Sequence, residues 1–212
     1  MRISQLKVEY SQRGTADIEL PDALLSVRGR DGAVPGEMKN VIFLNQVHGS
    51  EIIHNPVIGA SADGMILSRG TLSPGIRTAD CLPVFISSYD YTAAFHAGWR
   101  GLASGISYRM IKEFPTEPDF IVLGNCICGD CYQVGPDVRE KALRDLPEYP
   151  HPPGRLDLKR AALDQMAAAG LSEECTVFDI PECTVCRKDL FFSFRADGSD
   201  KRNLTWMKVK GV

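Results

Sequence analysis

Histidine is scarce in this chain, and two of its four copies stand where strands are expected to end. His48 follows a short apolar run in the segment NQVHG, and His96 follows another in AAFHAGWRG. Between them Cys81, in TADCLPV, stands at the start of a further expected strand. Small residues beside each side chain allow a ligand or backbone to approach closely. Strand ends are rigid platforms, so these three side chains could form one well-ordered site.

Two imidazoles and one thiolate are a ligand set that suits zinc or copper. A protein that supplies three ligands leaves one coordination position for water or substrate, which is typical of catalytic zinc. The same atoms could also act without a metal. Cys81 and His96 are expected on adjacent strands of a hairpin, where a thiolate could pair with an imidazolium. From the residues alone, we expect one site built from His48, Cys81 and His96, as metal ligands or as catalytic groups.

The second half of the chain carries two Cys-x-x-Cys pairs, Cys128 with Cys131 and Cys183 with Cys186. Such pairs are common in structural zinc sites. The chain has seven cysteines, an odd number, and its first residues show no apolar segment typical of a secretory signal. We therefore expect ligands, nucleophiles or core residues rather than a disulfide framework. A protein with a structural metal on these four residues and no turnover is one alternative.

Short β-branched and aromatic runs, bounded by Gly, Pro, Asp or Ser, predict the strands that must position these residues. These are Ile3–Glu9, Val41–Asn45, Gly64–Leu67, Leu82–Ser87, Tyr91–Phe95, Phe120–Gly124, Thr176–Asp179, Leu190–Phe194 and Leu204–Val209. Helices are expected over Gly101–Phe114, Asp137–Leu146 and Asp157–Ala169. Strands outnumber helices and do not alternate strictly with them. This favours an α/β (α+β) layered sandwich with mixed sheets and flanking helices, in a single domain over residues 1–212.

The composition limits the classes of partner. The chain has 212 residues, of which 44% are apolar and 24% charged, and a net charge of −3. This composition is ordinary for a globular protein and excludes disorder. Without a basic excess, a nucleic-acid partner is not expected. The longest apolar stretches are too short to cross a bilayer, so we expect no membrane partner and a cytoplasmic location. Nothing in the residue pattern indicates an oligomeric state.

Several motifs together resemble one known family. They are QVHG, ADGMI, TADCLPV and FHAGWRGL, followed by CYQVG and CTVCRKDLFFSFRADG. They resemble the laccase-domain family, also called the multicopper polyphenol oxidoreductase or purine nucleoside phosphorylase family, from about Val41 to Arg202. The resemblance implies a single layered α/β domain and a catalytic metal, usually zinc and sometimes copper. Its ligands would be His48, Cys81 and His96.

The chain departs from the family pattern in its second half. GNCICG stands where the family usually has Gly-Pro-Ser-Ile-Gly, and RADG stands where it usually has Arg-Arg-Asp-Gly. These changes leave the three candidate ligands in place. They bear instead on the substrate contacts that the second half of the chain would provide.

The resemblance implies phosphorolysis of adenosine, inosine and methylthioadenosine, and deamination of adenosine. The partners would then be small molecules, a purine nucleoside and phosphate. Phosphorolysis needs a cationic pocket, and arginine suits bidentate binding of an oxyanion. Arg77, Arg100 and Arg195 are candidate contacts to phosphate or ribose, and Gln46 and Asp80 are further candidates for substrate binding. Asp80 could instead brace its own loop.

Two other enzyme classes stay open. A copper-dependent polyphenol oxidase is one, although four histidines cannot build a cluster of several coppers; a single copper could still oxidise phenols. A metal-free Cys-His amidase or deamidase is the other, because the order and spacing of Cys81 and His96 also resemble the catalytic pair of certain toxin deamidases. Editing of cell-wall precursors, proposed for some relatives, belongs to this second class.

Overall fold

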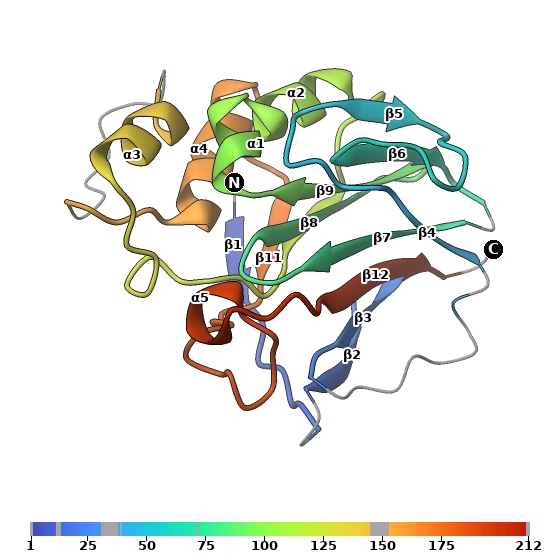
Figure 1. Ribbon diagram of the computed structural model, residues 1–212. Helices are drawn as coiled ribbons and strands as arrows, with labels where there is room; N and C mark the ends of the chain where they lie inside the picture. Colours follow the sequence, from blue (N-terminus) through green and yellow to red (C-terminus); the bar gives the residue numbers. More distant parts are fainter. Residues whose placement is uncertain are drawn as a thin grey trace.

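The computed structural model describes residues 2–11, 14–30, 38, 40–70, 72–144 and 153–210 of the chain. Strands in this part of the chain form two mixed sheets (Figure 1). The larger sheet has seven strands in the order β1-β11-β10-β8-β9-β6-β5. Their bounds are β1 Arg2–Gln5, β5 Ile52–His54, β6 Gly64–Ser68, β8 Leu82–Ser87, β9 Tyr91–Ala97, β10 Phe120–Leu123 and β11 Thr176–Asp179.

The smaller sheet has five strands in the order β2-β3-β12-β7-β4. Their bounds are β2 Thr15–Glu19, β3 Ala23–Arg28, β4 Val41–Phe43, β7 Ser73–Thr78 and β12 Asn203–Val209. Strands β4 and β7 run parallel, whereas the other neighbours in this sheet run antiparallel. After β4, and again after β7, the chain leaves this sheet and enters the larger one. These two crossings carry His48 and Cys81.

The helices of the described residues are α1 Trp99–Ala103, α2 Ile106–Glu113, α3 Pro136–Ala142, α4 Leu158–Ala168 and α5 Phe194–Asp197. Figure 1 shows α1, α2 and α4 on one face of the larger sheet and the smaller sheet on its other side. Helix α4 begins as the sequence predicts, because the Asp157 carboxylate accepts a hydrogen bond from the N–H of Arg160. None of the described helices is long and apolar enough to cross a membrane.

Alternating side chains of the larger sheet fill two cores. On β8, Val84 and Ile86 face the helices and pack in one cluster with Met110 of α2. Phe85, between them, faces the other way and packs with Leu25 of the smaller sheet. This alternation is the ordinary consequence of the pleat. The expected layered α/β sandwich with mixed sheets and flanking helices, in a single domain, is therefore confirmed.

The strand predicted over Leu190–Phe194 is wrong. Phe191 and Phe192 are buried, but Phe194 is exposed and already begins α5. The Ser193 hydroxyl accepts a hydrogen bond from the N–H of Ala196 at the start of that helix. The side chain of Asn203 takes the place of a strand partner. It accepts from the N–H of Phe192 and donates to its carbonyl, each at 2.9 Å. Burial without a backbone ladder explains the apolar pattern.

Other element boundaries also differ from the prediction. The helix predicted over Gly101–Phe114 is divided into α1 and α2, because Gly105 adopts a positive φ of 76° between them. The strand predicted over Ile3–Glu9 ends at Gln5. The helix predicted over Asp137–Leu146 corresponds to α3, which begins one residue earlier, at Pro136, and ends at Ala142. The last two predicted residues lie outside the described part of the chain.

Four strands escaped the prediction: β2, β3, β5 and β7. Strand β7 is the instructive one, because it contains Pro74 and Gly75, which are typical of loops. A Cβ at Gly75 would lie 2.5 Å from the ring of Phe43 on β4, so only glycine fits beside that ring. The glycine marks close packing of two parallel strands rather than a turn.

Candidate functional site

The parallel pair β4 and β7 brings His48 and Cys81 together. Because the strands run in the same direction, their carboxyl ends lie side by side, and each continues into a crossing to the larger sheet. Beyond the last backbone pair, the Gln46 side chain extends the contact: it accepts from the N–H of Arg77 at 2.9 Å and donates to its carbonyl at 2.8 Å. The two crossings are thereby fixed against each other.

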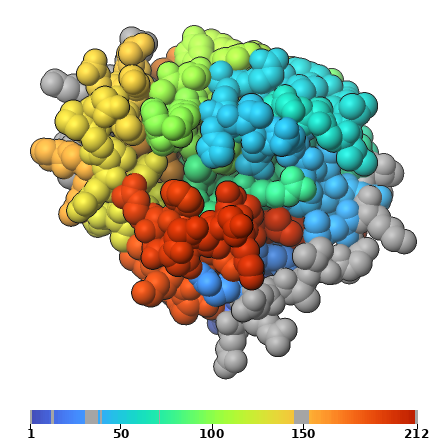
Figure 2. Space-filling model, in the orientation of Figure 1, coloured from blue at the N-terminus to red at the C-terminus, as the bar shows by residue number. Residues whose placement is uncertain are grey.

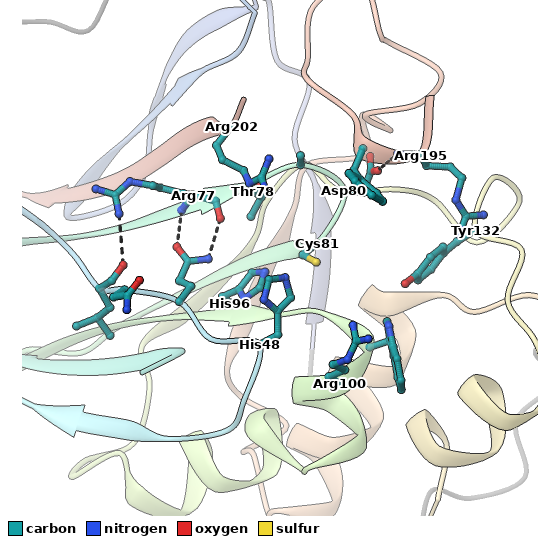
Figure 3. A pocket seen from close by; sticks show the side chains of 16 residues that line it. His48, Arg77, Thr78, Asp80, Cys81, His96, Arg100, Tyr132, Arg195 and Arg202 are labelled. Atoms are coloured by element: carbon teal, nitrogen blue, oxygen red, sulfur yellow. Dashed lines mark hydrogen bonds between the residues drawn. The ribbon is translucent and has the colours of Figure 1, made fainter. Parts of the chain in front are cut away.

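His96 reaches the same place through the β8–β9 hairpin. Leu82 pairs with Ala97 and Pro83 with His96, so Cys81, just before β8, lies next to the end of β9. We call His48, Cys81 and His96 the His–Cys–His group. One ligand-type atom from each lies within 4.8 Å of the other two. The imidazole rings of His48 and His96 meet edge to face, with centroids 4.8 Å apart (Figure 3).

Asp63, at the entrance to β6, holds the histidines in position. It is fully buried, and its Oδ1 lies 2.8 Å from Nδ1 of His96. The same carboxylate accepts hydrogen bonds from three successive backbone amides, those of Val47, His48 and Gly49, at 3.2, 3.0 and 2.6 Å. A carboxylate on one ring nitrogen fixes the tautomer and leaves the other nitrogen free to bind a metal. Asp63 therefore orients the His96 imidazole and fixes the backbone that carries His48.

The backbone around the group is specialised. Among the described residues, only three non-glycine residues have a positive φ, and two of them are His48 at 60° and Asp80 at 87°. Such conformations are uncommon, and they concentrate at functional sites. Gly98 precedes α1 and lies against the group: a Cβ there would come within 2.9 Å of the Cys81 sulfur. Glycine is thus required for the sulfur to occupy its present place.

Charges in the group reinforce each other. Burial acts to raise the pKa of Cys81, but hydrogen bonds from His48 and His96 outweigh it and lower the pKa to about 6. Burial likewise acts to lower the pKa of His96, but Asp63 and Cys81 raise it to about 9. For Asp63, burial acts to raise the pKa, yet His96 and the amide of Gly49 lower it below its usual value. Without a metal, the group favours a thiolate beside an imidazolium at neutral pH.

The donor set fits a transition metal. Two imidazoles and one thiolate are available, one imidazole is held by a carboxylate, and a glycine keeps the space beside the sulfur open. His96 is buried, Cys81 is half-buried and His48 is exposed, so the group opens toward solvent on one side. Three protein ligands with an open side are the arrangement of catalytic zinc sites, and the same ligands also suit copper.

The open side of the group faces a cavity of about 540 Å³, which we call the main cavity (Figure 3). All eight candidate residues of the sequence analysis line it: Gln46, His48, Arg77, Asp80, Cys81, His96, Arg100 and Arg195. The lining also includes residues that sequence reasoning missed: Trp99, Tyr132, Phe194 and Arg202. The lining residues come from the ends of strands in both sheets, from α1, from the loop between β10 and α3, and from α5. Residues distant in sequence thus converge on one hollow.

Asp80 braces the wall of the main cavity. Its Oδ1 accepts from the Thr184 hydroxyl at 2.6 Å, its Oδ2 accepts from the N–H of Arg195 at 2.7 Å, and its carbonyl accepts from the N–H of Ile127 at 2.9 Å. It therefore joins three separate loops at the residue next to Cys81. Both carboxylate oxygens are engaged in these contacts, which indicates the bracing role that the sequence analysis left open.

The four arginines of the cavity have only neutral partners. Arg77 donates to the carbonyl of Leu44 at 3.3 Å, Arg195 to that of Gln133 at 2.9 Å, and Arg202 to that of Lys201 at 2.9 Å. The Arg100 guanidinium lies over the Trp99 ring, 4.5 Å from its centroid. Within the described residues, none of the four forms an ion pair with a carboxylate. Their positive charge is left uncompensated.

The site residues that sequence reasoning missed differ in how far the sequence alone could have identified them. Asp63 lies in ADGMI, one of the family motifs, and a buried carboxylate before a strand could have been proposed as a partner of histidine. Arg202 follows the strand-like aromatic segment that was misassigned, so its position could not be inferred. Tyr132 follows Cys131, and burial raises its pKa to about 12, which keeps its hydroxyl protonated.

The four cysteines of the two Cys-x-x-Cys pairs also meet. We call Cys128, Cys131, Cys183 and Cys186 the tetracysteine group; their sulfurs lie within 4.8 Å of one another. The Cys131 and Cys186 sulfurs are 3.5 Å apart, and the N–H of Cys128 donates to the Cys183 sulfur at 3.2 Å. Burial acts to raise the pKa of Cys183, but the amides of Cys186 and Cys128 lower it. The group lies outside the lining of the main cavity.

Solved structures share this fold. YlmD from Geobacillus stearothermophilus superposes with a TM-score of 0.81 at 23% sequence identity, covering 96% of this chain and 99% of that one. A protein from Neisseria meningitidis superposes with a TM-score of 0.79 at 24% identity, covering 93% and 100%. Both similarities extend over nearly the whole molecule.

Sequence comparison identifies the family. A relative from Aquifex aeolicus, named purine nucleoside phosphorylase, is 32% identical over 148 residues, which are 68% of this chain and 68% of that protein. Purine nucleoside phosphorylase YfiH of Escherichia coli is 30% identical over 195 residues, or 86% and 79%. The family described as multi-copper polyphenol oxidoreductase laccase matches residues 28–209. That match includes the His–Cys–His group and every residue of the main cavity, and the chain belongs to this family.

Proposed function

We propose that the chain is a metal-dependent purine nucleoside phosphorylase that acts on adenosine, inosine and methylthioadenosine and also deaminates adenosine. The observation that carries this proposal is the place of the His–Cys–His group on the wall of a cavity with four arginines that form no ion pair within the described residues. Relatives 30–32% identical to the chain bear the name purine nucleoside phosphorylase, which supports the same reaction. His48, Cys81 and His96 hold the metal in this proposal, with zinc preferred over copper.

The arginines provide the phosphate site. Phosphate carries between one and two negative charges near neutral pH, and a cavity lined by four guanidinium groups attracts it. Arg100 is exposed beside His96 and, among the described residues, forms no ion pair, so it is free to reorient toward a ligand. Arg77 and Arg202 keep N–H donors beyond those bound to backbone carbonyls. Phosphate held there lies near the proposed metal.

Aromatic side chains provide the nucleoside site. Trp99, Tyr132 and Phe194 line the same cavity, and Phe194 is 66% exposed although its ring is large and apolar. Flat rings of this kind stack on purine bases, and such stacking is worth about 1–3 kcal/mol. The protonated hydroxyl of Tyr132 adds a hydrogen-bond donor. The cavity thus offers an apolar wall for the base and a cationic wall for phosphate.

In phosphorolysis, a phosphate oxygen bonds to C1′ of the ribose, the C1′–N9 bond breaks, and the departing purine takes up a proton. The arginines orient phosphate for this displacement, and the aromatic walls hold the base in line with it. When bound, zinc supplies a Lewis acid that stabilises developing negative charge. Asp63 keeps the His96 imidazole oriented and the His48 backbone in place, because its carboxylate is hydrogen-bonded to both.

The test follows purine release by the zinc-loaded protein. Inosine with phosphate is expected to give hypoxanthine and ribose 1-phosphate, and omission of phosphate to stop the reaction. Cys81→Ala is expected to lower the rate by about 100-fold or more, since it removes a metal ligand. Cys175→Ala, in a buried cysteine outside both groups, is the matched control. Equal turnover in wild type and Cys81→Ala would contradict the proposal.

Parallel assays separate the finer activities. Ammonia release from adenosine tests deamination, and phenol oxidation by the copper-loaded protein tests the oxidase chemistry that the family description names. If only the copper form turned over, and only with phenols, the phosphorylase assignment would be replaced by the oxidase. Zinc content measured on protein purified without added metal decides which ion the chain selects.

A second candidate rests on the thiolate–imidazolium pair. The lowered pKa of Cys81 and the raised pKa of His96 are those of an activated nucleophile with a charged partner. A metal-free amidase or deamidase, including one that edits cell-wall precursors, would use them directly. Chelation discriminates the two candidates: it abolishes a metal-dependent phosphorolysis, whereas an amidase keeps or gains its activity toward amide substrates such as muropeptides.

A further inference from the structure

We propose that the tetracysteine group is a second metal site, which binds one structural zinc ion through the four thiolates of Cys128, Cys131, Cys183 and Cys186. The first pair lies in the loop after β10, and the second in the segment between β11 and α5. The fold therefore closes two Cys-x-x-Cys pairs on each other from positions more than fifty residues apart in the sequence. This ion is additional to the one proposed for the His–Cys–His group.

The separation of the sulfurs fits zinc. At a Zn–S distance of about 2.3 Å, a tetrahedral ion holds its sulfurs about 3.8 Å apart. The Cys131 and Cys186 sulfurs are 3.5 Å apart, and all four sulfurs lie within 4.8 Å of one another. A disulfide would need about 2.05 Å. All four cysteines are free, so the thiols converge without forming bonds between them.

The backbone at each pair is folded as a tight turn around the sulfurs. The amides of Cys131 and Tyr132 both donate to the carbonyl of Cys128, at 3.0 Å, and the amide of Arg187 donates to the carbonyl of Cys183 at 2.9 Å. The Cys128 amide donates to the Cys183 sulfur at 3.2 Å. An N–H directed at sulfur stabilises a thiolate, the form that binds metal. These contacts arrange the pairs before any ion arrives.

The ligand set is closed. Four thiolates satisfy the four positions of tetrahedral zinc and leave none for water or substrate, which is the mark of a structural site. The lining of the main cavity in the described residues includes none of the four cysteines. Tetrahedral four-thiolate sites hold zinc or iron–sulfur centres, and sulfurs within 4.8 Å of one another enclose a single ion rather than a cluster. Binding releases the protons of those thiols that are still protonated, so charge balances without an oxidant.

The ion would stiffen the wall of the main cavity. Tyr132 follows Cys131 and lines the cavity, and Thr184 follows Cys183 and donates to Asp80, the residue beside Cys81. Backbone contacts also join the same loops. Cys126 and Cys183 form an isolated parallel β-bridge, and the N–H of Thr184 donates to the carbonyl of Cys126. Fixing the four sulfurs therefore fixes both loops against Asp80. The second zinc positions this wall without touching a substrate.

Metal counting on the full chain tests the proposal. Protein purified under reducing conditions with zinc in the medium is expected to contain two zinc ions per chain. The double variant Cys131→Ser/Cys186→Ser is expected to contain one, and His48→Ala also one, but a different one. Cys175→Ser is the matched cysteine control and is expected to keep two. Cys131 and Cys186 are chosen because they are the more accessible members, so their replacement disturbs the core least.

Two readouts identify which ion is lost. Cobalt(II) in place of zinc gives an intense sulfur-to-metal absorption when four thiolates bind it, so this band is expected in His48→Ala and absent from the double variant. On the wild type itself, a thiol-specific mercurial is expected to release two zinc ions, which makes the result independent of how the variants fold. No zinc in reduced His48→Ala, or no loss of zinc from wild type to the double variant, would overturn the proposal. Because the count needs no substrate, it is independent of the phosphorylase assignment.

Discussion

The His–Cys–His group and the tetracysteine group lie in the same molecule but are built in opposite ways. The first takes its side chains from the ends of strands in two packed sheets, and it opens onto the main cavity. The second takes its side chains from two loops joined by a few backbone contacts. Figure 2 shows the segments of the second half, in yellow and red, meeting the green and blue segments of the first half across one face.

The difference separates two uses of similar ligands. A group on strand ends is held by the fold whether or not a metal is bound, so a metal there can keep an open position for chemistry. A group on loops has little else to fix it, so a metal there contributes stability to the fold. Accordingly, variants at the first group should affect activity first, and variants at the second should affect stability first.

Removing the Asp63 carboxylate should break the first group and spare the second. Asp63→Ala leaves three partly buried backbone amides and the buried His96 ring without an acceptor. Each unsatisfied buried donor costs about 1–3 kcal/mol, so a loss of roughly 3 kcal/mol or more in unfolding free energy is expected. Zinc affinity of the first group should fall by about 100-fold. Zinc content and denaturant unfolding measure both effects.

The exposed Asp200→Asn is the matched control for Asp63 and should leave both quantities at the wild-type value. If Asp63→Ala lost the zinc bound by four thiolates while keeping the other ion, the contrast between the groups would be wrong. The cobalt spectrum distinguishes the two cases.

Alkylation of metal-stripped protein should distinguish the cysteines of the two groups. The pKa of Cys81 is lowered to about 6, whereas the pKa values of Cys131 and Cys186 are raised. Only the thiolate reacts, so lowering the pH toward 6 should preserve the reaction of Cys81 and suppress the reactions of Cys131 and Cys186. Cys183 is left out of this comparison because its pKa is also lowered. At pH 7, iodoacetamide should label Cys81 at least about tenfold faster than Cys131 or Cys186. Peptide mapping across pH 5 to 9 gives the rates, and equal rates at pH 7 would contradict this.

A single methyl group should also weaken the first group. Gly98→Ala places a Cβ 2.9 Å from the Cys81 sulfur, which must move. Overpacking of this kind costs about 1–3 kcal/mol, so zinc affinity should fall by about tenfold. Gly70→Ala meets only a carbonyl at 3.7 Å and serves as the control. Competition with a chromogenic chelator measures affinity, and an unchanged value for Gly98→Ala would show that the sulfur is not confined there.

The smallest effect is expected at the cationic wall. Arg100→Lys keeps the charge but removes the planar fork that binds phosphate through two hydrogen bonds. Losing about 1 kcal/mol of such binding should raise the KM for phosphate about fivefold and leave zinc content at two per chain. Steady-state kinetics at varied phosphate give the value. A larger change in the KM for inosine than for phosphate would move Arg100 to the nucleoside side of the cavity.

Sequence reasoning reached the centre of the site because its residues are local to strand ends. His48, Cys81 and His96 each follow or precede a run whose apolar pattern marks a strand, and the β8–β9 hairpin follows from a short polar link. Parallel pairing of β4 with β7 was out of reach. It depends on Gly75 lying against Phe43, a contact between residues that read as a loop and a strand end.

The walls of the main cavity were predictable only in part. Arg100 is adjacent to HAGW and could be chosen by position, whereas Arg202 depends on how the segment before it folds. That segment was misassigned because buried aromatic residues look alike in a strand and in an irregular stretch held by a side chain such as Asn203. The convergence of the two cysteine pairs also depends on tertiary structure. Their spacing in the sequence suggests it, but the pairing of β10 with β11 is what brings the two loops together.

The crossings after β4 and β7 link metal binding to the packing of the two sheets. His48 and Cys81 lie where the chain passes from one sheet to the other, whereas His96 belongs to β9 of the larger sheet. Because Gln46 joins the two crossings, slippage between the layers moves them relative to His96 before either sheet needs to lose a strand. An ion bound by the His–Cys–His group would therefore dissociate when the two sheets begin to separate. Its release into solution would mark the first step of denaturation.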